Sequence, residues 1–481
     1  MQEPETGTVG WHSARWALLV GVALVTAVAF PGTGASVAPI VGSSEALRQF
    51  VGPVLYDTIL LAPFWALLAV YRRETYRSLR ELTFVMVLFA VAIAAAGMGA
   101  RWAPGRPELS PVPFVAMLFT MLWSGRLAIF AAITLAVLIG AQWIHPDQAA
   151  LLFGLTGGVA GALGIRMVRR RKSIYPTVAL VAGAYVLTSL ALGLTYAWTP
   201  VGVLVSATWG IGVAVGSAAI AQLLLPLAES ATHVTTDLTL LELSDPSRPL
   251  LKRLALEAPG TYAHSIAMAG LSEAAAEAVG ANGLLARVGC YYHDIGKLAR
   301  PQYFVENQPR AGSPHDRLDP VESARIIRDH VDAGLALARE HHLPEVLRAF
   351  VAEHHGTTRV EYFLDRARQG GVTPLDDRAF TYSGPRPSSA ETAIAMLADG
   401  AEAAVRALAD PTPEALRQAI ARVVSSRVAS HQLDDAPLTL RDLDRIQAEF
   451  ARVLGGMYHD RVIYPAPSGE VAGEIPRTRG A

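Results

Sequence analysis

Residues 14–228 form an almost continuous apolar stretch, and this stretch limits the fold more than any other feature of the sequence. It contains a series of segments, most of which approach the roughly 20 apolar residues that a helix needs to cross a bilayer. The chain has 481 residues, 52% of them apolar, and a mean hydropathy of +0.31, which is too high for an ordinary soluble protein. We therefore predict a multi-span helical membrane domain with spans near residues 15–31, 50–71, 81–100, 112–124, 126–143, 149–168, 174–198 and 201–228.

Basic residues indicate on which side of the membrane two of the loops lie. One group follows the second apolar segment and another follows the sixth, so both loops are expected in the cytoplasm. Two loops on one side require an even number of crossings between them, which a tight helical hairpin at Ser124-Gly125-Arg126 provides. Eight crossings then leave the C-terminal half in the cytoplasm, in a multi-pass protein of the cell membrane. The basic residues are Arg72, Arg73, Arg77 and Arg80, and Arg166, Arg169, Arg170, Arg171 and Lys172.

The first apolar segment allows two interpretations. Arg15, an apolar run and Ala27-Val28-Ala29 resemble a signal peptide with its cleavage site, but the segment is also consistent with a retained helix. The membrane half contains few ionisable residues, and Asp57 and Arg126 are the main candidates for burial. Because transport usually needs polar groups near mid-membrane, this half is interpreted as an anchor and sensor rather than a transporter.

The remainder of the chain has the composition of a soluble helical domain. We predict a membrane domain at 1–229, a connector at 230–260, an all-helical domain at 261–465 and a disordered tail at 466–481. No alternating strand pattern is found, so the fold class is all-α throughout. The single Cys290 excludes an internal disulfide and is expected to be a small buried hydrophobe. The net charge of −1 gives no indication of a nucleic-acid polymer as partner.

Potential metal ligands cluster in the soluble half, where eight of the thirteen histidines lie between residues 264 and 355. Imidazoles mixed with carboxylates suit Fe, Mn, Zn or Ni, and the lack of thiolates argues against a structural zinc site. A carboxylate directly after a ligating histidine can bridge two metals, which is a phosphohydrolase arrangement. A single histidine is more often a core residue, but the joint occurrence favours metal binding. The candidate ligands are His264, His293, Asp294, His330, His354, His355 and Asp399.

Other polar residues near this cluster have two interpretations each. Lys297 lies four residues after His293, on the same helical face, and could neutralise a substrate phosphate. The alternative is a solvated helix lysine. His341-His342 is expected at the surface, and His315 either approaches the site or caps a turn.

Several longer motifs resemble the seven-transmembrane HD-domain family of bacterial membrane proteins, within the HD phosphohydrolase superfamily. That family includes the cyclic-di-AMP phosphodiesterases. The resemblance covers roughly residues 230–465 closely and the membrane segments in general pattern. The motifs are Leu240-Leu241-Glu242-Leu243-Ser244, Glu257-Ala258-Pro259-Gly260-Thr261-Tyr262, His293-Asp294-Ile295-Gly296-Lys297, Glu306-Asn307-Gln308, His354-His355-Gly356-Thr357-Thr358 and Met396-Leu397-Ala398-Asp399.

The resemblance implies a helical HD fold with two divalent metals, iron or manganese, that cleaves cyclic di-AMP to linear pApA. Asp294 and Lys297 are the candidate catalytic residues, and Lys297, Thr357 and Arg386 are the candidate substrate contacts. Arg386 lies in the stretch from Tyr382 to Pro387, which is either a rim loop of the site or a solvated loop. One metal would be held by His264, His293, Asp294 and Asp399, and the other by Asp294, His330, His354 and His355. The expected partners are the cyclic dinucleotide and the lipid bilayer, and a monomer and a homodimer both stay open.

Two departures from known patterns bear on function. Enzymes that act on cyclic di-GMP carry Gly-Tyr-Pro after a His-His pair, whereas Gly356-Thr357-Thr358 stands here. The family also usually carries a large extracellular domain after its first membrane helix, whereas residues 32–49 give a short loop, so external sensing is in doubt. Two alternatives stay open: hydrolysis of another nucleotide, and a non-catalytic nucleotide receptor.

Overall fold

The computed structural model describes residues 8–29, 44–142, 148–164, 174–308, 312–371 and 376–458. Within these ranges the chain is helical and contains no β-strand, only an isolated bridge between Arg359 and Thr381. The predicted all-α fold class is therefore confirmed. The predicted disordered tail at 466–481 and the basic residues from Arg166 to Lys172 lie outside the described residues.

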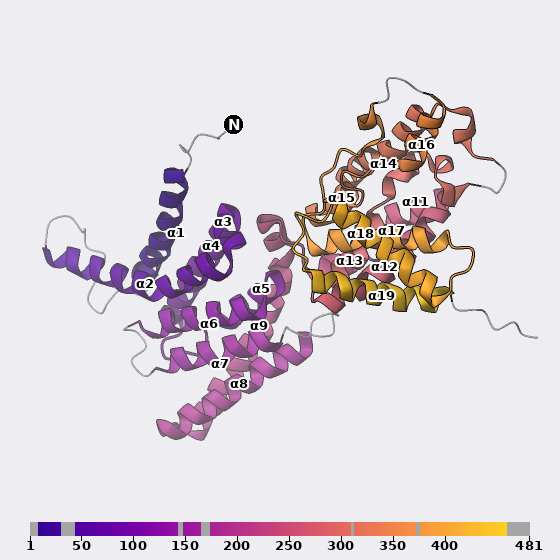
Figure 1. The fold of residues 1–481 in the computed structure, drawn as a ribbon. Helices are drawn as coiled ribbons and strands as arrows, with labels where there is room; N and C mark the ends of the chain where they lie inside the picture. Colours follow the sequence, from indigo (N-terminus) through magenta and orange to yellow (C-terminus); the bar gives the residue numbers. More distant parts are fainter. Residues whose placement is uncertain are drawn as a thin grey trace, which may run out of the picture. The chain divides into compact units, whose positions relative to one another are not determined.

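The chain divides into two compact units, Met1–Leu240 and Leu241–Ala481. Unit 1 contains the predicted series of apolar helices (Figure 1). Four of the described helices are long and apolar enough to cross a membrane, and four more are shorter apolar helices. The helices of unit 1 are α1 (Thr8–Ala29), α2 (Ser44–Tyr71), α3 (Arg73–Arg77), α4 (Leu79–Trp102), α5 (Val112–Leu122), α6 (Gly125–Gly140), α7 (Ala149–Gly164), α8 (Ile174–Thr195) and α9 (Pro200–Thr232).

Small residues allow the helices of unit 1 to pack closely. A Cβ at Gly158 would lie 2.7 Å from Val112 and 2.8 Å from Ala132, and a Cβ at Gly157 would lie 2.5 Å from the Tyr185 ring. These glycines therefore serve close helix packing. Asp57 is buried as expected and accepts a hydrogen bond from the Gln142 amide at 3.1 Å. Arg126 is exposed, so its predicted burial is wrong.

The turn between α5 and α6 is as short as the sequence predicts. The Ser124 hydroxyl accepts a hydrogen bond from the amide of Leu127, which caps the first turn of α6. Only two residues separate the end of α5 from the start of α6. The two helices consequently form a hairpin, and α7 packs against both of them.

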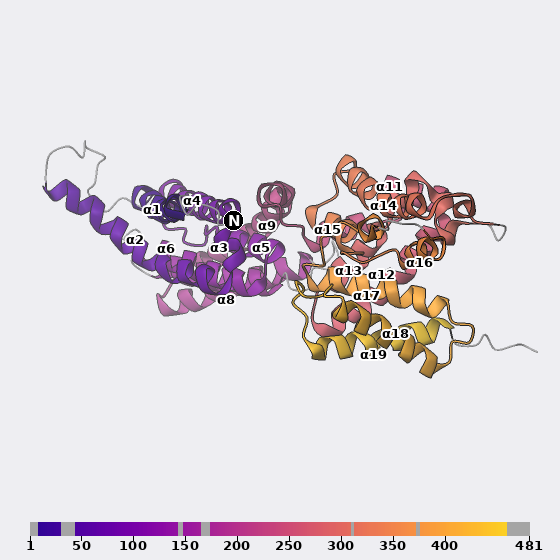
Figure 2. The ribbon, with the colours of Figure 1, turned by 45° about the horizontal axis from the view of Figure 1, so that its top comes forward.

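Unit 2 is a bundle in which α12, α13 and α17 lie between α14–α16 on one side and α18–α19 on the other (Figure 2). Its apolar core is built mainly from α12, α17, α18 and α19. Cys290 lies in this core and is fully buried, as predicted. The helices are α10 (Asp237–Leu243), α11 (Pro249–Glu257), α12 (Pro259–Val279), α13 (Gly283–Tyr292), α14 (Pro320–Glu340), α15 (Glu345–Glu353), α16 (Glu361–Gln369), α17 (Ala390–Arg406), α18 (Pro413–Ala429) and α19 (Leu440–Tyr458).

Local sequence fixes the ends of the helices that frame the site. Gly280 ends α12 with a φ of +80°, a conformation that glycine adopts without strain. The Asn282 side chain then caps α13 through the Leu285 amide. Asp319 caps α14, and Ser389 forms a capping box with Thr392 at the start of α17.

Candidate metal centre

The seven candidate ligands converge from five helices of unit 2. His264 projects from α12, His330 from α14 and Asp399 from α17. His293 and His354 are the C-cap residues that directly follow α13 and α15. Because the C-terminus of a helix carries partial negative charge, both helix ends favour a cation in the cluster. Asp294 directly follows His293, and His355 directly follows His354.

The carboxylate of Asp294 stands at the centre, with a different set of imidazoles at each oxygen. Its Oδ1 lies 3.3 Å from Nε2 of His330 and 3.5 Å from Nε2 of His354. Its Oδ2 lies 3.1 Å from Nε2 of His293 and 3.9 Å from Nε2 of His264. The side chain of Asp294 is only 2% exposed. The cluster is therefore split into two halves that share one carboxylate.

The backbone fixes which tautomer three of these rings adopt in their neutral form. Nδ1 of His293 lies 2.8 Å from the carbonyl of Cys290, and Nδ1 of His354 lies 3.0 Å from the carbonyls of Phe350 and Val351. Nδ1 of His330 likewise contacts a carbonyl of its own helix. A carbonyl can only accept, so Nδ1 carries the proton and Nε2 presents a lone pair to the cluster.

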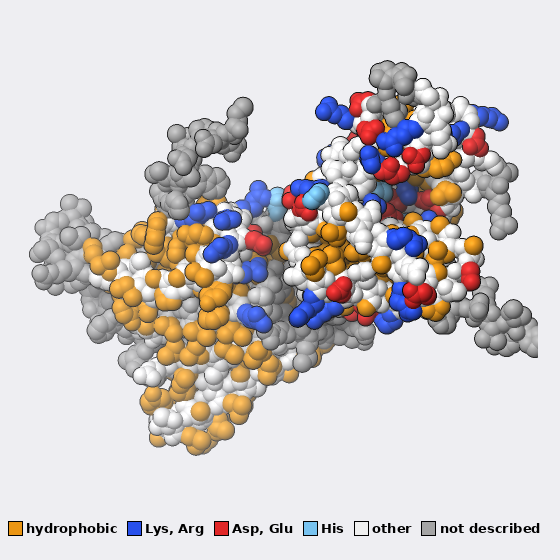
Figure 3. All heavy atoms as spheres, in the orientation of Figure 1, with side chains coloured by type: hydrophobic (Ala, Val, Ile, Leu, Met, Phe, Trp, Pro, Cys, Tyr) orange, Lys and Arg blue, Asp and Glu red, His pale blue; other side chains and the backbone are white. Residues whose placement is uncertain are grey.

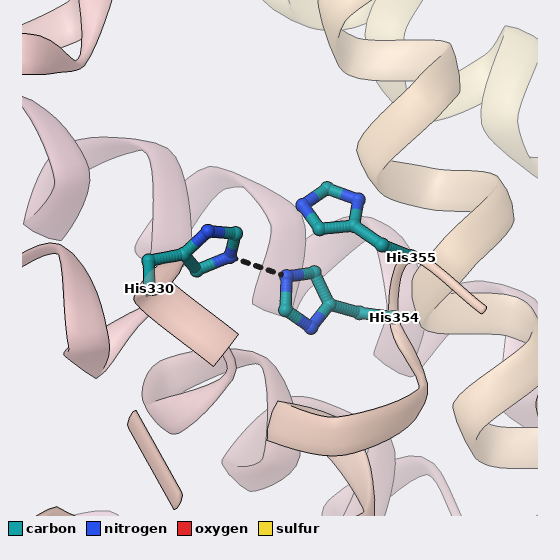
Figure 4. Close-up of side chains that lie close together, drawn as sticks. All are labelled: His330, His354 and His355. Carbon is teal, nitrogen blue, oxygen red and sulfur yellow. Dashed lines mark hydrogen bonds between the residues drawn. The ribbon is translucent and has the colours of Figure 1, made fainter. Parts of the chain in front are cut away.

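In these tautomers the Nε2 lone pairs face other acceptor atoms rather than hydrogen-bond donors. The Nε2 atoms of His330 and His354 face each other at 3.2 Å, and Figure 4 shows these two rings and His355 pointing toward a common space. Nε2 of His293 and Oδ1 of Asp294 are buried without a hydrogen-bond partner. Buried acceptors that converge in this way are costly unless a cation lies between them. The donor set therefore fits divalent metals, with ligand atoms within 4.8 Å of one another in each half.

The second carboxylate, Asp399, lies on the other side of the cluster. Its Oδ1 is 3.2 Å from Nε2 of His264, and its Oδ2 is 3.9 Å from Nδ1 of His355. The Tyr382 ring stacks on the His355 imidazole with centroids 4.3 Å apart. Burial and the neighbouring rings of His354 and His330 hold the pKa of His355 well below its usual range, which keeps this imidazole neutral and able to bind a metal.

The charges in the cluster favour ionised carboxylates. Burial raises the pKa of Asp294, but His293 and Lys297 outweigh burial and hold it well below the usual range. Burial lowers the pKa of His264, yet hydrogen bonds to Asp399 and Glu402 raise it to about 10. In the absence of other cations, this cluster therefore attracts protons, which bound metals would replace.

Lys297 is neither a solvated lysine nor on the same α-helical face as His293. The α-helix ends at Tyr292, and residues 295–299 form a 3₁₀ helix, so four-residue spacing no longer predicts a shared face. The Lys297 side chain is 13% exposed, and its ammonium lies 2.7 Å from both Asp294 Oδ2 and Glu306 Oε1. Burial lowers the pKa of Lys297, whereas these two carboxylates raise it above its usual value. A permanent positive charge therefore lies directly beside the central carboxylate.

Glu306 connects Lys297 to the start of α12. The Thr261 hydroxyl donates to Glu306 Oε1 at 3.1 Å, and the Asn307 amide donates to the Thr261 hydroxyl at 2.8 Å. Gly260 makes this approach possible, because a Cβ there would overlap the backbone carbonyl of Glu306. The motif Glu306-Asn307-Gln308 has no assigned role in the sequence, and this network supplies one.

A glycine also allows the 3₁₀ segment to reach α14. A Cβ at Gly296 would overlap the backbone carbonyl of His330. We expect Gly296→Ala to destabilise unit 2 by roughly 1–3 kcal/mol, because two backbones must separate. The control Gly270→Ala places its Cβ in open space on α12 and should be neutral or slightly stabilising. Hydrogen exchange of peptides from residues 283–340 in increasing urea measures the stability of both variants. Equal unfolding midpoints for Gly296→Ala and Gly270→Ala would refute the packing role of Gly296.

Glu402 completes the environment of His264, and it was not among the predicted site residues. Its Oε2 accepts from Nδ1 of His264 at 3.1 Å, which aims Nε2 at the cluster. Glu402 lies three residues after Asp399 on α17, so the helical spacing places both carboxylates on one face. This spacing is the signal that could have revealed it.

We expect Glu402→Gln to lower metal affinity about 10–100-fold, because the imidazole loses its negatively charged partner. Titration of the metal-free protein against a competing chelator measures this affinity. Glu414→Gln, an exposed carboxylate on α18, is the matched control and should leave affinity unchanged. Equal affinities of the two variants would show that Glu402 does not support the metal centre.

The two other predicted substrate contacts lie in hydrogen-bonded positions. The amide of Thr357 donates to Oε1 of Gln432 at 2.9 Å. The guanidinium of Arg386 lies 2.8 Å from an Asp435 carboxylate oxygen and donates to the carbonyl of His431. The structure therefore does not bring Arg386 among the ligands. The predicted surface pair, His341-His342, is exposed as expected.

His315 is buried and is held away from the candidate ligands. Its Nε2 contacts the Tyr303 carbonyl at 2.9 Å, and its ring packs on Phe363. It lies in a short 3₁₀ helix (Pro314–Arg317) that Ser313 caps. These contacts indicate a structural role for His315 in the packing around Phe363.

Both units match a described protein family. Residues 47–236 match the family described as "7TM receptor with intracellular HD hydrolase", and residues 261–404 match the HD domain. The chain belongs to the seven-transmembrane HD-domain family. The 47–236 match contains seven longer helices, α2 and α4 to α9, and leaves α1 outside it. The protein is accordingly a membrane protein with an HD domain, which is a metal-dependent hydrolase fold.

Curated relatives share this organisation over part of their length. The chain is 36% identical over 371 residues to "Cyclic-di-AMP phosphodiesterase PgpH" of Bacillus subtilis, covering 76% of this chain and 52% of the relative. It is 34% identical over 361 residues to the protein of the same name from Listeria monocytogenes, covering 74% and 50%. The chain thus spans about half the length of the curated relatives it matches.

Unit 2, which contains the HD domain, also matches solved structures. The crystal structure of the HD domain of L. monocytogenes phosphodiesterase PgpH is 40% identical, with a TM-score of 0.43, covering 44% of this chain and all of that chain. A structure of that domain in complex with cyclic-di-AMP matches with the same identity and TM-score over 45% of this chain.

Proposed function

We propose that this protein is a metal-dependent phosphodiesterase that hydrolyses cyclic di-AMP to linear pApA. The observation that carries the proposal is the division of the Asp294 carboxylate between two sets of imidazole lone pairs. Such a shared carboxylate suits two metals, the arrangement that activates water against a phosphodiester. The names of the relatives supply the substrate, and Gly356-Thr357-Thr358 argues against the cyclic di-GMP group.

Each half of the cluster would hold one divalent metal, iron or manganese. When bound, these metals supply a Lewis acid for the phosphate oxygens and a water of lowered pKa. Asp294 would bridge the two sites. The first site would comprise His264, His293, Asp294 and Asp399, and the second Asp294, His330, His354 and His355.

The protein's own groups orient this chemistry. The ammonium of Lys297 offers its charge beside Asp294, where it can bind a phosphate oxygen. Glu306 holds that ammonium in place, and Glu402 holds His264. Thr357 is a candidate contact because Gln432 anchors it two residues after His355. Arg386 would have to leave Asp435 to reach a phosphate.

The catalytic unit is proposed to lie at the cytoplasmic face. The arginines between α2 and α4 support this, since cytoplasmic loops carry an excess of basic residues. Fusion of a reporter that is active only in the cytoplasm, placed after residue 458, should give full signal. A silent reporter at that position, with a signal from a fusion in the loop between α4 and α5, would reverse the orientation.

Substrate comparison tests the function directly. The full-length protein in detergent, loaded with Mn²⁺ or Fe²⁺ under anaerobic conditions, is given cyclic di-AMP, cyclic di-GMP and pApA separately. We expect cyclic di-AMP to be cleaved with the highest kcat/KM, and pApA to accumulate as the product. Faster cleavage of either other nucleotide would assign the site to a different substrate. Cyclic di-AMP binding without turnover by metal-loaded protein would indicate a receptor.

A further inference from the structure

Unit 1 contains an apolar cavity of about 620 Å³ that no part of the catalytic chemistry uses. Helices α4 and α9 form its walls, and α5 with the preceding loop closes it. Its size is within the range of small-ligand sites. The lining carries no charged side chain, and its largest members on α4 are Phe84, Leu88 and Val91.

One end of this apolar cavity lies near two polar, basic side chains, Arg80 and His233. Arg80 lies four residues before Phe84, hence on the same face of α4, and His233 follows the last residue of α9. Nη1 of Arg80 lies 2.6 and 2.7 Å from the two ring nitrogens of His233, so this pair joins the two walls. Both side chains are on the surface, and no described carboxylate forms an ion pair with Arg80. On the face of unit 1 seen in Figure 3, basic side chains gather at one end of a largely apolar surface.

We propose that unit 1 binds an anionic phospholipid, with one acyl chain between α4 and α9 and the phosphate against Arg80 and His233. Basic pockets between membrane helices at the cytoplasmic side are suited to anionic headgroups. The stretch of α4 from Phe84 to Ala95 spans about 16 Å, close to the ~15 Å of hydrocarbon in one leaflet. The cavity thus offers an apolar slot of one leaflet's depth with a positive charge at its mouth.

The α4 wall favours a lipid chain over a helix from a second copy. Helices associate closely in membranes through small residues, whereas the α4 wall presents Phe84, Val87, Leu88 and Val91. A flexible acyl chain fits between such side chains without requiring close backbone approach. The lipid would therefore be held by van der Waals contacts along α4 and α9 and by charge at Arg80.

The site lies next to the segment that leaves the membrane unit. Glu229, in the last turn of α9, accepts hydrogen bonds from the Thr236 amide at 3.0 Å and the Thr239 hydroxyl at 2.8 Å. The end of α9 and the start of α10 are thereby fixed to each other. A lipid seated on α9 contacts the helix from which the connector begins, whatever nucleotide the catalytic unit hydrolyses.

Two glycines of α9 give a matched test. Gly216 lines the cavity and Gly212, one turn earlier, does not, and a Cβ at either position meets nothing within 4 Å. Gly216→Leu should fill the slot, while Gly212→Leu adds the same side chain outside it. Arg80→Gln removes the charge at the mouth, and Arg73→Gln removes an exposed charge from α3 instead.

The full-length protein is equilibrated with an equal mixture of phosphatidylglycerol and phosphatidylcholine with identical acyl chains, and bound lipids are counted by native mass spectrometry. We expect enrichment of phosphatidylglycerol on the wild-type protein. Arg80→Gln should lower it about fivefold, and Gly216→Leu should remove the tightest-bound lipid, while both controls retain it. No enrichment on the wild type, or equal effects of the two glycine variants, would overturn the proposal. A changed oligomeric state in Gly216→Leu with undiminished lipid binding would assign the cavity to a second copy.

Discussion

Asp294→Asn should abolish hydrolysis and deplete the protein of metal at the same time. Asparagine preserves the size of the side chain but provides a single neutral oxygen, so it cannot bridge the two imidazole sets that meet Oδ1 and Oδ2. We expect kcat to fall on the order of a thousandfold or more, equivalent to at least about 4 kcal/mol of barrier. Metal content by elemental analysis and turnover of cyclic di-AMP are measured on the same sample.

The matched control is Asp444→Asn, an exposed carboxylate on α19. It should retain wild-type metal content and turnover. If Asp294→Asn kept the metal content of the wild type, the carboxylate would not be a bridging ligand. Hydrogen exchange of unit 2 separates loss of metal from loss of fold, because Asp294→Asn also leaves the buried ammonium of Lys297 without one of its two carboxylate partners.

Lys297→Met should lower kcat about 10²–10³-fold while both metals stay bound. Methionine keeps the apolar part of the side chain but removes the ammonium that lies 2.7 Å from Asp294 Oδ2. Under the proposed function that ammonium would lie next to the reacting phosphate, where loss of one preorganised electrostatic contact typically costs this much. Metal analysis together with steady-state kinetics distinguishes this outcome from the loss of a metal ligand, which would lower metal content as well as kcat.

Two further variants sharpen the second prediction. Lys252→Met removes an exposed lysine of α11 and should leave kcat unchanged. Glu306→Gln keeps the ammonium but loosens its position, so its kcat should fall less than that of Lys297→Met. Loss of metal from Lys297→Met would contradict the proposed role, since it would make the lysine a support of the metal site rather than a contact of the substrate.

The sequence allows the ligand set to be proposed because its chemistry-bearing residues are rare and adjacent. His293-Asp294 and His354-His355 each place two donors at one helix end, which no packing requirement explains. The family resemblance implied how these donors divide around Asp294, but residue spacing alone does not predict it, because the division depends on the approach of α12 and α14 to α13. The approach rests on Gly260 and Gly296, whose missing side chains become informative only in three dimensions.

The supporting carboxylates were harder to find than the ligands. Glu306 lies in a motif to which the sequence assigns no role, and Glu402 is distinguished only by its spacing from Asp399. An acidic residue outside such a context is ordinarily solvated. Lys297 shows the limit of periodicity, since the change from α-helix to 3₁₀ helix after His293 changes the angle per residue. Lys297 nevertheless contacts Asp294, because the 3₁₀ turn places its ammonium beside that carboxylate.

In the membrane half, hydropathy predicted the positions of the helices better than it predicted which single charged residues are buried. All eight apolar segments correspond to helices in the structure, and the hairpin at Ser124 is present. Asp57 is buried because Gln142 supplies a donor from another helix, whereas Arg126 sits at a helix start and is exposed. The difference lies in the hydrogen bond from Gln142 to Asp57, and a hydropathy profile contains no information about such contacts between helices.

The central claim is that Asp294 joins two metal sites, and anomalous diffraction from crystals of the metal-loaded catalytic unit tests it most directly. We predict two anomalous peaks roughly 3.5–4 Å apart, one bound to each oxygen of Asp294. The first peak should be surrounded by His264, His293 and Asp399, and the second by His330, His354 and His355. A single peak at full metal loading, or two peaks with Asp294 bound to only one, would contradict the account.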